Sequence, residues 1–297
     1  MELRDMEYFL AIAREENITA AAKSLHLSQP ALTKQLKMLE DEFGKQLVIR
    51  KNRGITLTED GMIFKRRADE ILDLARRTQN EIRTSDAELS GDIYICAGES
   101  EGIHFLTQAA KRLRDHHKDV RFHISSGDTD DVVEELEKGL IDFGLLFSAL
   151  NPSKYNSIQI PFQDTWGVLM RKDSELAEKS IIETKDLIGK PLIVPRNDDY
   201  LNTAAAFLNT DPSKINISAT YSLIFNASIM VADGLGYALC LDKILNLSGD
   251  TELCFRPLVP EVKAAMYVVW KKHKVLSRCA DAFLKELTGS DNTNIQM

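Results

Sequence analysis

The residues best suited to contact a polyanion lie near the start of the chain. Lys34 and Lys37 recur on one face of an expected helix over residues 28–40, together with the hydroxyl of Thr33 and without a carboxylate. Ammonium groups bind phosphate oxygens, whereas small polar and apolar side chains contact base edges in the major groove. Ser28 is the expected N-cap, so free N–H groups at the start of this helix would also suit a phosphate. The pattern predicts a DNA-binding face.

A helix-turn-helix and a basic hairpin are expected to position this face. Four apolar residues of the same helix recur at steps of four, three and four and predict a buried stripe: Leu32, Leu36, Leu39 and Phe43. Thr19 is expected to cap a shorter helix just upstream, and β-prone runs at 47–50 and 55–58 predict a hairpin with a basic tip. The residues expected to contact DNA are Thr19, Ser28, Gln29, Pro30, Ala31, Thr33, Lys34, Lys37, Arg50 and Arg53.

The order of these residues resembles the N-terminal domain of LysR-type transcriptional regulators. The matching positions are Ala21, Ala22, Leu25, the run Ser28-Gln29-Pro30-Ala31, Leu39, Glu40, Phe43, Gly44, Leu47, Arg50, Leu57, Thr58 and Gly61. Thr33 stands where the family more often has Ser, and Val48 stands where it more often has Phe. Both changes keep the chemical character of the side chain. The resemblance implies a winged helix-turn-helix over residues 1–58 that binds double-stranded DNA.

The charge distribution agrees with this interpretation. The whole chain has a net charge of −8, but the segment from Lys23 to Arg53 contains seven basic and three acidic residues. From Gly91 to Met297 the balance reverses, with 22 basic and 29 acidic residues. A basic segment joined to an acidic remainder is typical of a nucleic-acid-binding protein that carries a second, non-DNA domain.

A long linker helix is expected over residues 59–89, because no proline or glycine follows Gly61 in that stretch. Six of its residues recur at alternating steps of four and three and form a heptad seam: Phe64, Ala68, Ile71, Ala75, Thr78 and Ile82. The helix could pack on its own domain, but its length and its small seam residues favour pairing with a second chain. The family resemblance implies the same homodimer, a further assembly into a homotetramer, and an operator with two half-sites.

From residue 90 onward, strand-like and helix-like segments alternate, which predicts a parallel α/β architecture. Two such units are expected, with the chain crossing between them near Ile160 and near Lys263. The arrangement resembles the two-lobed, periplasmic-binding-protein-like effector domain of LysR-type regulators. The expected division places lobe I at 90–161 and 264–297 and lobe II at 162–263. The predicted fold class is therefore α/β, preceded by the winged helix-turn-helix and the linker helix.

A small-molecule effector is expected at the carboxyl ends of the parallel strands, between the lobes. The residues expected to bind it are Glu99, Ser100, Glu101, Thr129, Phe147, Pro195, Arg196 and Phe225. Ser100 and Thr129 are expected to begin helices, where a hydroxyl can hold an anion or simply cap the helix. Arg196 would face a carboxylate on the effector, although Glu99 and Glu101 would repel one. The chemical class of the effector stays open.

Other residue types point away from chemistry. The four cysteines, Cys96, Cys240, Cys254 and Cys279, lie far apart in apolar runs, so buried reduced thiols are expected, with a redox-sensing pair as the alternative. We find no spacing typical of a metal site and no Ser/His/Asp or Cys/His set, so we expect no metal, no cofactor and no enzymatic activity. The absence of a signal segment and of a long apolar span predicts a cytoplasmic protein with no membrane partner.

Three functions compete at this point. The first is a bacterial transcription regulator that responds to a small-molecule effector of unknown class. The second is an enzyme or a solute carrier built on the α/β lobes, with the N-terminal helices serving only for assembly. The third is a DNA-compacting protein without an effector. We predict the first, because a complete DNA-binding pattern and two complete lobes occur in one chain.

Overall fold

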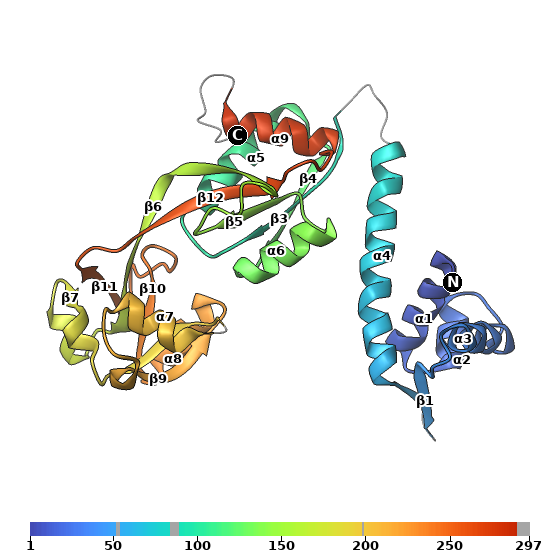
Figure 1. Cartoon of the computed structure of the whole chain (residues 1–297), viewed down its shortest axis with the longest axis horizontal. Helices are drawn as coiled ribbons and strands as arrows, with labels where there is room; N and C mark the ends of the chain where they lie inside the picture. Colours follow the sequence, from blue (N-terminus) through green and yellow to red (C-terminus); the bar gives the residue numbers. More distant parts are fainter. Residues whose placement is uncertain (52–53, 84–88, 198, 290–297) are drawn as a thin grey trace. The chain divides into compact units, whose positions relative to one another are not determined.

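The computed structural model describes residues 1–51, 54–83, 89–197 and 199–289. Contacts divide the chain into two compact units, Met1–Ser85 and Asp86–Met297 (Figure 1). The first unit is mainly helical, and the second contains the strands and helices of an α/β fold. The finer division at residues 58, 89, 161 and 263 stays a prediction.

The N-terminal unit is a helix-turn-helix followed by a hairpin and a long helix. Its elements are α1 (Leu3–Glu15), α2 (Ile18–Ser24), α3 (Gln29–Phe43), β1 (Val48–Lys51), β2 (Gly54–Leu57) and α4 (Glu59–Arg83). Leu32, Leu36 and Leu39 are buried, as the periodicity predicts, and they pack against α1 and α2 in one core. The prediction for Phe43 is wrong: it is the last residue of α3 and is 42% exposed, although its ring meets that of Phe64 in an edge-to-face arrangement.

Side-chain caps set the ends of these helices. Ser28 accepts a hydrogen bond from the N–H of Ala31 and caps α3, as expected. The hydroxyl of Thr58 likewise accepts a bond from the N–H of Gly61 at the start of α4 (2.9 Å). The expectation that Thr19 caps α2 is wrong, because Asn17 accepts the bonds from the free N–H groups at that helix start. Asparagine is among the strongest N-cap residues, so it takes this position.

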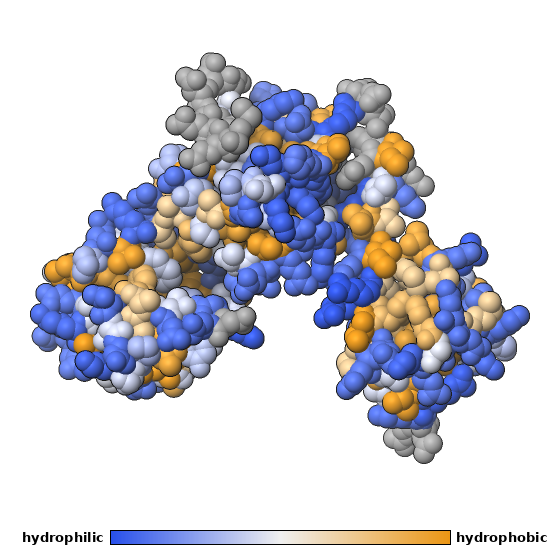
Figure 2. Space-filling view, viewed as in Figure 1, coloured by the Kyte–Doolittle hydropathy of each residue, from blue (hydrophilic) through white to orange (hydrophobic). Residues whose placement is uncertain are grey.

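Helix α4 buries only part of its apolar surface within the unit. Ala68 and Leu72 are buried against Met6 of α1. Ile71, Leu74 and Ile82 are exposed, at 41%, 45% and 79%, and hydrophobic surface is visible along α4 in Figure 2. The sequence predicts that this helix reaches residue 89; residues 84–88 lie outside the described part of the chain, and Leu89 is described and is not helical.

The second unit is built on a strongly twisted mixed sheet. Its strands are β3 (Gly91–Ala97), β4 (Val120–Ser126), β5 (Phe143–Leu146), β6 (Tyr155–Arg171), β7 (Ile182–Glu183), β8 (Pro191–Pro195), β9 (Asn216–Tyr221), β10 (Tyr237–Leu241), β11 (Leu253–Val259) and β12 (Lys263–Lys271). Its α-helices are α5 (Ile103–His116), α6 (Thr129–Lys138), α7 (Tyr200–Phe207), α8 (Ile224–Ala232) and α9 (Arg278–Thr288). The main strand order is β4-β3-β5-β12-β6-β10-β8-β9. Strands β3, β4 and β5 run parallel, as do β8, β9 and β10.

Two long antiparallel strands, β6 and β12, join two lobes (Figure 1). The first part of β6 pairs with β12, and its last part pairs with β10 and β11. We call the side with β3, β4 and β5 lobe I and the side with β8, β9 and β10 lobe II. Strand β6 is 17 residues long and therefore reaches from lobe I into lobe II. The crossing expected near Ile160 falls within β6 and the one expected near Lys263 falls at the start of β12; the lobe boundaries at these positions stay a prediction.

Each lobe has apolar cores on both faces of its part of the sheet. In lobe I, α5 and α9 cover one face and α6 covers the other (Figure 1). In lobe II, one core includes residues of α7 and the other includes residues of α8. These cores fix the carboxyl ends of the parallel strands of both lobes, which is where the loops expected to bind an effector begin.

Candidate nucleic-acid interface and effector cavity

The outward face of α3 carries the side chains that the sequence assigns to DNA. Lys34 and Lys37 are exposed, as are Pro30 and Ala31. The side-chain amide of Gln29 donates a hydrogen bond to the hydroxyl of Thr33, with 2.7 Å between Nε2 and Oγ1. This bond leaves the amide oxygen and one amide hydrogen of Gln29 for a further partner.

The rest of the expected DNA-binding set lies close to α3 along the chain. Thr19, near the start of α2, and Arg50, on β1, have exposed side chains. Ser28 is exposed and already caps α3. Arg53 lies outside the described residues. The structure therefore presents nine of the ten expected residues on the surface or partly exposed, and it leaves their contacts with DNA as a prediction.

Sequence reasoning missed the role of Glu40 in this unit. Its carboxylate accepts hydrogen bonds from the backbone N–H groups of Leu47 and Val48, at 2.8 and 3.2 Å. The contact ties the second half of α3 to the start of the hairpin. No helical or strand periodicity could reveal a bond between a helical residue and a backbone group seven positions further along the chain.

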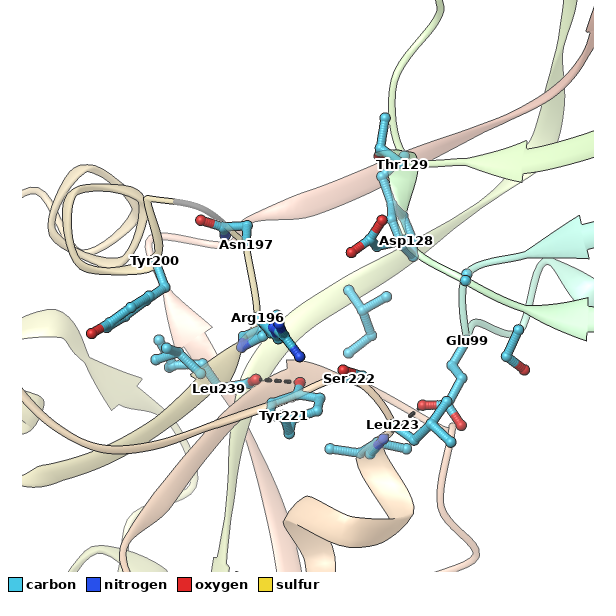
Figure 3. Close-up of a pocket in the computed structure, with 18 of the residues that line it drawn as sticks. Glu99, Asp128, Thr129, Arg196, Asn197, Tyr200, Tyr221, Ser222, Leu223 and Leu239 are labelled. Carbon is cyan, nitrogen blue, oxygen red and sulfur yellow. Dashed lines mark hydrogen bonds between the residues drawn. The ribbon is translucent and has the colours of Figure 1, made fainter. Parts of the chain in front are cut away.

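A cavity of about 540 Å³ lies between the two lobes of the second unit (Figure 3). Lobe I lines it with the loops that follow β3 and β4 and with the end of β5. Lobe II lines it with the loops that follow β8 and β9, with α7 and with β10. The cavity therefore lies at the carboxyl ends of the parallel strands, where ligands bind in open α/β sheets.

Five of the eight residues that the sequence assigns to an effector line this cavity: Glu99, Thr129, Phe147, Pro195 and Arg196. The other three, Ser100, Glu101 and Phe225, are absent from its lining. Ser100 is 7% exposed, and its hydroxyl donates a long hydrogen bond to the carbonyl of Gly98 (3.5 Å). Phe225 is 64% exposed. Their contact with an effector remains a prediction that the shape of the cavity does not support.

The two helix starts in lobe I differ from expectation. Helix α6 begins at Thr129, but Asp128 is the cap, and its Oδ1 accepts bonds from the N–H groups of Asp130 and Asp131. Helix α5 begins at Ile103, after a turn that includes Ser100. The prediction that Ser100 starts this helix is therefore wrong. At the start of α6, Asp128 rather than Thr129 is the cap, in line with the stronger N-cap preference of aspartate over threonine.

One carboxylate joins the two lobes across the cavity. Glu99, after β3 in lobe I, accepts a hydrogen bond from the backbone N–H of Ile224, the first residue of α8 in lobe II, at 2.6 Å (Figure 3). Beside it, the N–H of Glu101 donates to Asp164 on β6 at 3.1 Å. Asp164 is 6% exposed, and burial raises its pKa. Glu99 thus satisfies a helix N-terminus that would otherwise suit an external anion.

The apolar wall of the cavity comes mainly from residues that the sequence did not single out. They include Trp166, Phe207, Leu239, Leu241 and Ile244. Trp166 and Phe207 meet edge to face, with 5.1 Å between ring centroids. Tyr221 also lines the cavity, donates its hydroxyl to the carbonyl of Leu239 at 2.8 Å, and has its pKa raised by burial. Such residues look like ordinary core positions in the sequence, because only the pairing of strands brings them to one space.

The described residues form neither a metal-binding cluster nor a reactive cysteine site. They contain no cluster of three or more His, Cys, Asp or Glu side chains that could hold a metal ion. All four cysteines are free and buried, as expected. Burial raises the pKa of Cys240 to about 12 and also raises that of Cys96. Thiols in this environment are poor nucleophiles, because the thiolate is the reactive form.

Family models match both units. A model described as "Bacterial regulatory helix-turn-helix protein, lysR family" matches residues 3–62, and one described as "LysR substrate binding domain" matches residues 86–291. The chain belongs to the LysR family. It is a DNA-binding transcriptional regulator with a substrate-binding effector domain, and not an enzyme. No helix in the described ranges is both long and apolar enough to cross a membrane.

Individual relatives are distant in sequence and similar in fold. The chain is 27% identical over 280 residues to the Hca operon transcriptional activator HcaR of Escherichia coli (strain K12), covering 92% of each chain. It is 29% identical over 196 residues to the probable cat1 operon transcriptional activator of Acinetobacter lwoffii, covering 65% of this chain and 64% of that one. Its fold resembles full-length CbnR in complex with target DNA, with a TM-score of 0.76, 22% identity, and coverage of 97% and 99%.

Proposed function

We propose that α3 enters the major groove of an operator and reads its sequence. Gln29, Pro30, Ala31 and Thr33 would approach base edges. The residues that would hold the flanking backbone are Thr19, Ser28, Lys34, Lys37, Arg50 and Arg53. The observation that carries this division is the outward face of α3, which exposes both lysines and has no acidic residue between Gln29 and Leu39. The solved structure of CbnR on its target DNA supports the same general use of this fold.

We further propose that two chains pair through α4. The exposed apolar side chains of Ile71, Leu74 and Ile82 lie on a single side of this helix, at its middle and end. A second copy of the same face would remove them from water. A pair related by a twofold axis would place two copies of α3 on two half-sites.

A small molecule in the cavity would then regulate transcription. The cavity is formed by loops of both lobes, so a ligand that contacts both favours one lobe spacing over others. Because the proposed partner is the chromosome of a bacterium, we place the protein in the cytoplasm.

Binding of the purified protein to the DNA upstream of its own gene tests this function. Fluorescence anisotropy would compare that DNA with a scrambled duplex while the salt concentration is raised. We expect specific binding with a steep salt dependence, and a slope smaller by about two units for Lys34→Ala/Lys37→Ala, because each lost phosphate contact removes about one unit. Lys111→Ala, an exposed lysine of α5, is the matched control and should keep the wild-type slope. Equal, salt-insensitive binding to both duplexes would refute the proposal.

A further inference from the structure

The charges around the cavity are strongly unequal. Among the described lining residues, four carry carboxylates (Glu99, Asp128, Asp130 and Asp131), and all four belong to lobe I. Arg196, from lobe II, is the one basic side chain in that described lining. Figure 3 shows Asp128 and Arg196 extending into the cavity from opposite lobes. An anionic ligand would meet one attractive charge and several repulsive ones.

The position that would best receive an anion is already filled. Backbone N–H groups at a helix start bind carboxylates and phosphates. At the start of α8, that role is taken by Glu99, whose Oε2 lies 2.6 Å from the nitrogen of Ile224. An effector carboxylate would therefore have to displace an internal carboxylate that is held at high local concentration by the chain itself.

Two of the acidic lining residues, Glu99 and Asp128, can still accept hydrogen bonds from a ligand in the cavity. Glu99 uses Oε2 for α8, and Asp128 uses Oδ1 for the cap of α6. A carboxylate has about four acceptor positions, so both side chains can accept further bonds. An ammonium group, with three donors, matches such a pair of acceptors, and charge-assisted bonds of this kind are the strongest available to a small ligand.

The remaining wall suits an apolar body of aromatic size. Phe147, Trp166 and Phe207 line the cavity together with leucines from β5 and β10. Cavities of roughly 300–1,000 Å³ accept small organic ligands, and the volume here, about 540 Å³, lies within that range. An ammonium group on the ligand could also lie over the face of one of these aromatic side chains.

We infer that the effector is a small apolar molecule carrying a protonated amine, which faces Glu99 and Asp128 in lobe I. This inference rests on the proposed function of the cavity as the effector site. It reverses the expectation that Arg196 faces a carboxylate on the effector. Glu99 and Asp128 thereby become the residues that select the charge of the ligand.

Calorimetric titration with shape-matched pairs tests the inference on the full-length protein. The probes are 2-phenylethylamine against 3-phenylpropionate, and tryptamine against indole-3-propionate. We expect at least one amine to bind about tenfold or more tightly than its matched acid. Tighter binding of the acids, or no binding of either amine up to about 10 mM, would overturn the inference.

Conservative variants separate charge from structure. Glu99→Gln and Asp128→Asn keep an oxygen that can accept the bonds from α8 and α6, so both helix starts stay satisfied. Each variant should weaken amine binding by about tenfold and bring the amine and the acid closer in affinity. Glu178→Gln, an exposed glutamate of lobe II that does not line the cavity, is the matched control and should bind as wild type. Unchanged amine affinity in both cavity variants would contradict the assignment.

The ligand inference and the proposed function in DNA binding can fail independently of each other. Binding to operator DNA is measured without any of these probes, so specific DNA binding combined with preference for acids would reject only the ligand class. Amine binding without specific DNA binding would instead reject the DNA-reading proposal. The two failures therefore have different signatures.

Discussion

Gln29 is the residue on which the proposed reading of bases depends most. Its amide donates to Thr33 on the exposed face of α3 and keeps further donor and acceptor capacity. Glutamine can pair with adenine through two hydrogen bonds in the major groove, and such a pair contributes about 1–3 kcal/mol of discrimination. Lys34, five residues further along α3, offers only a positive charge, which we propose holds a phosphate.

Gln29→Ala should therefore reduce the preference for operator over scrambled DNA, with little loss of affinity for scrambled DNA. Lys34→Ala should weaken binding to both by a similar factor, because phosphates are present in every sequence. Competition binding with the two duplexes would measure both effects. Equal losses for both variants on both duplexes would show that base reading and phosphate contact are not divided in this way.

We expect Asp92 to make a pH-dependent contribution to the stability of lobe I. Its carboxylate accepts bonds from the guanidinium of Arg121 at 2.8 and 3.2 Å and lies 2.9 Å from His123. The hydrogen bond from Arg121, followed by that from His123, lowers the pKa of Asp92 despite its partial burial. A lowered carboxyl pKa stabilises the folded state above the unfolded pKa of about 3.9, and this stabilisation is lost as pH falls through the folded value.

Asp92→Asn should thus lower the free energy of unfolding at pH 7 by about 0.5–1 kcal/mol, since Arg121 and His123 are largely exposed. The difference from wild type should shrink below about pH 4. Urea denaturation at pH 7, 4 and 3 would measure it, because only the lowest value lies clearly below the unfolded pKa of about 3.9. Asp250→Asn, in an exposed loop, is the control that should show no such trend. A constant difference at all three pH values would exclude the ionic contribution.

Helix α4 is the element whose surface is least explained by one chain. Ile71 and Leu74 are exposed in the described structure, so polar substitutions there should leave the fold of the monomer intact. Ile71→Ser/Leu74→Ser should raise the dissociation constant of the dimer by about tenfold or more, because about 25 cal/mol is lost per Å² of apolar area that stays in water.

Sedimentation equilibrium would measure this change, with circular dichroism to verify that the fold is retained. Lys65→Ser, an exposed position on another side of α4, should not alter the association. Wild-type association of the double variant would exclude this face of α4 as the interface.

Most elements could be predicted from the sequence, and the exceptions have local causes. The sequence did not predict the part of β6 that pairs with β12, because Pro161, Gln163 and Asp164 interrupt its apolar pattern. Strand β11 was not predicted either, because Arg256 and Pro257 interrupt its apolar pattern. Both strands depend on long-range pairing, which a local window of residues does not record.

At the scale of the whole molecule, the ordered motif near the N-terminus determined the class of protein before any tertiary contact was known. The sequence could predict candidate loops for the cavity, but not which of them lie together, because that depends on the order of the strands in the sheet. Glu99 and Arg196 were correctly placed among them, whereas Ser100 was misplaced by the length of the turn before α5. The bond between Glu99 and α8 joins residues 125 positions apart and has no signature in the sequence.

The acidic remainder of the chain also has a physical consequence for DNA binding. With a net charge of −8, the whole protein is not a general polyanion binder. The repulsion between its acidic second unit and phosphates would confine contact to the basic N-terminal segment. Because each chain would contact DNA through this one segment, pairing two chains would raise the affinity for an operator with two half-sites.

Nuclease protection of the operator is the measurement that tests the central claim most directly, namely that paired α3 helices read two half-sites. We expect two protected half-sites, centred about 10 bp or a multiple of that apart, and loss of the joint protection at low concentration in the Ile71→Ser/Leu74→Ser variant. A single protected site of one half-site length, unaffected by that variant, would contradict this claim.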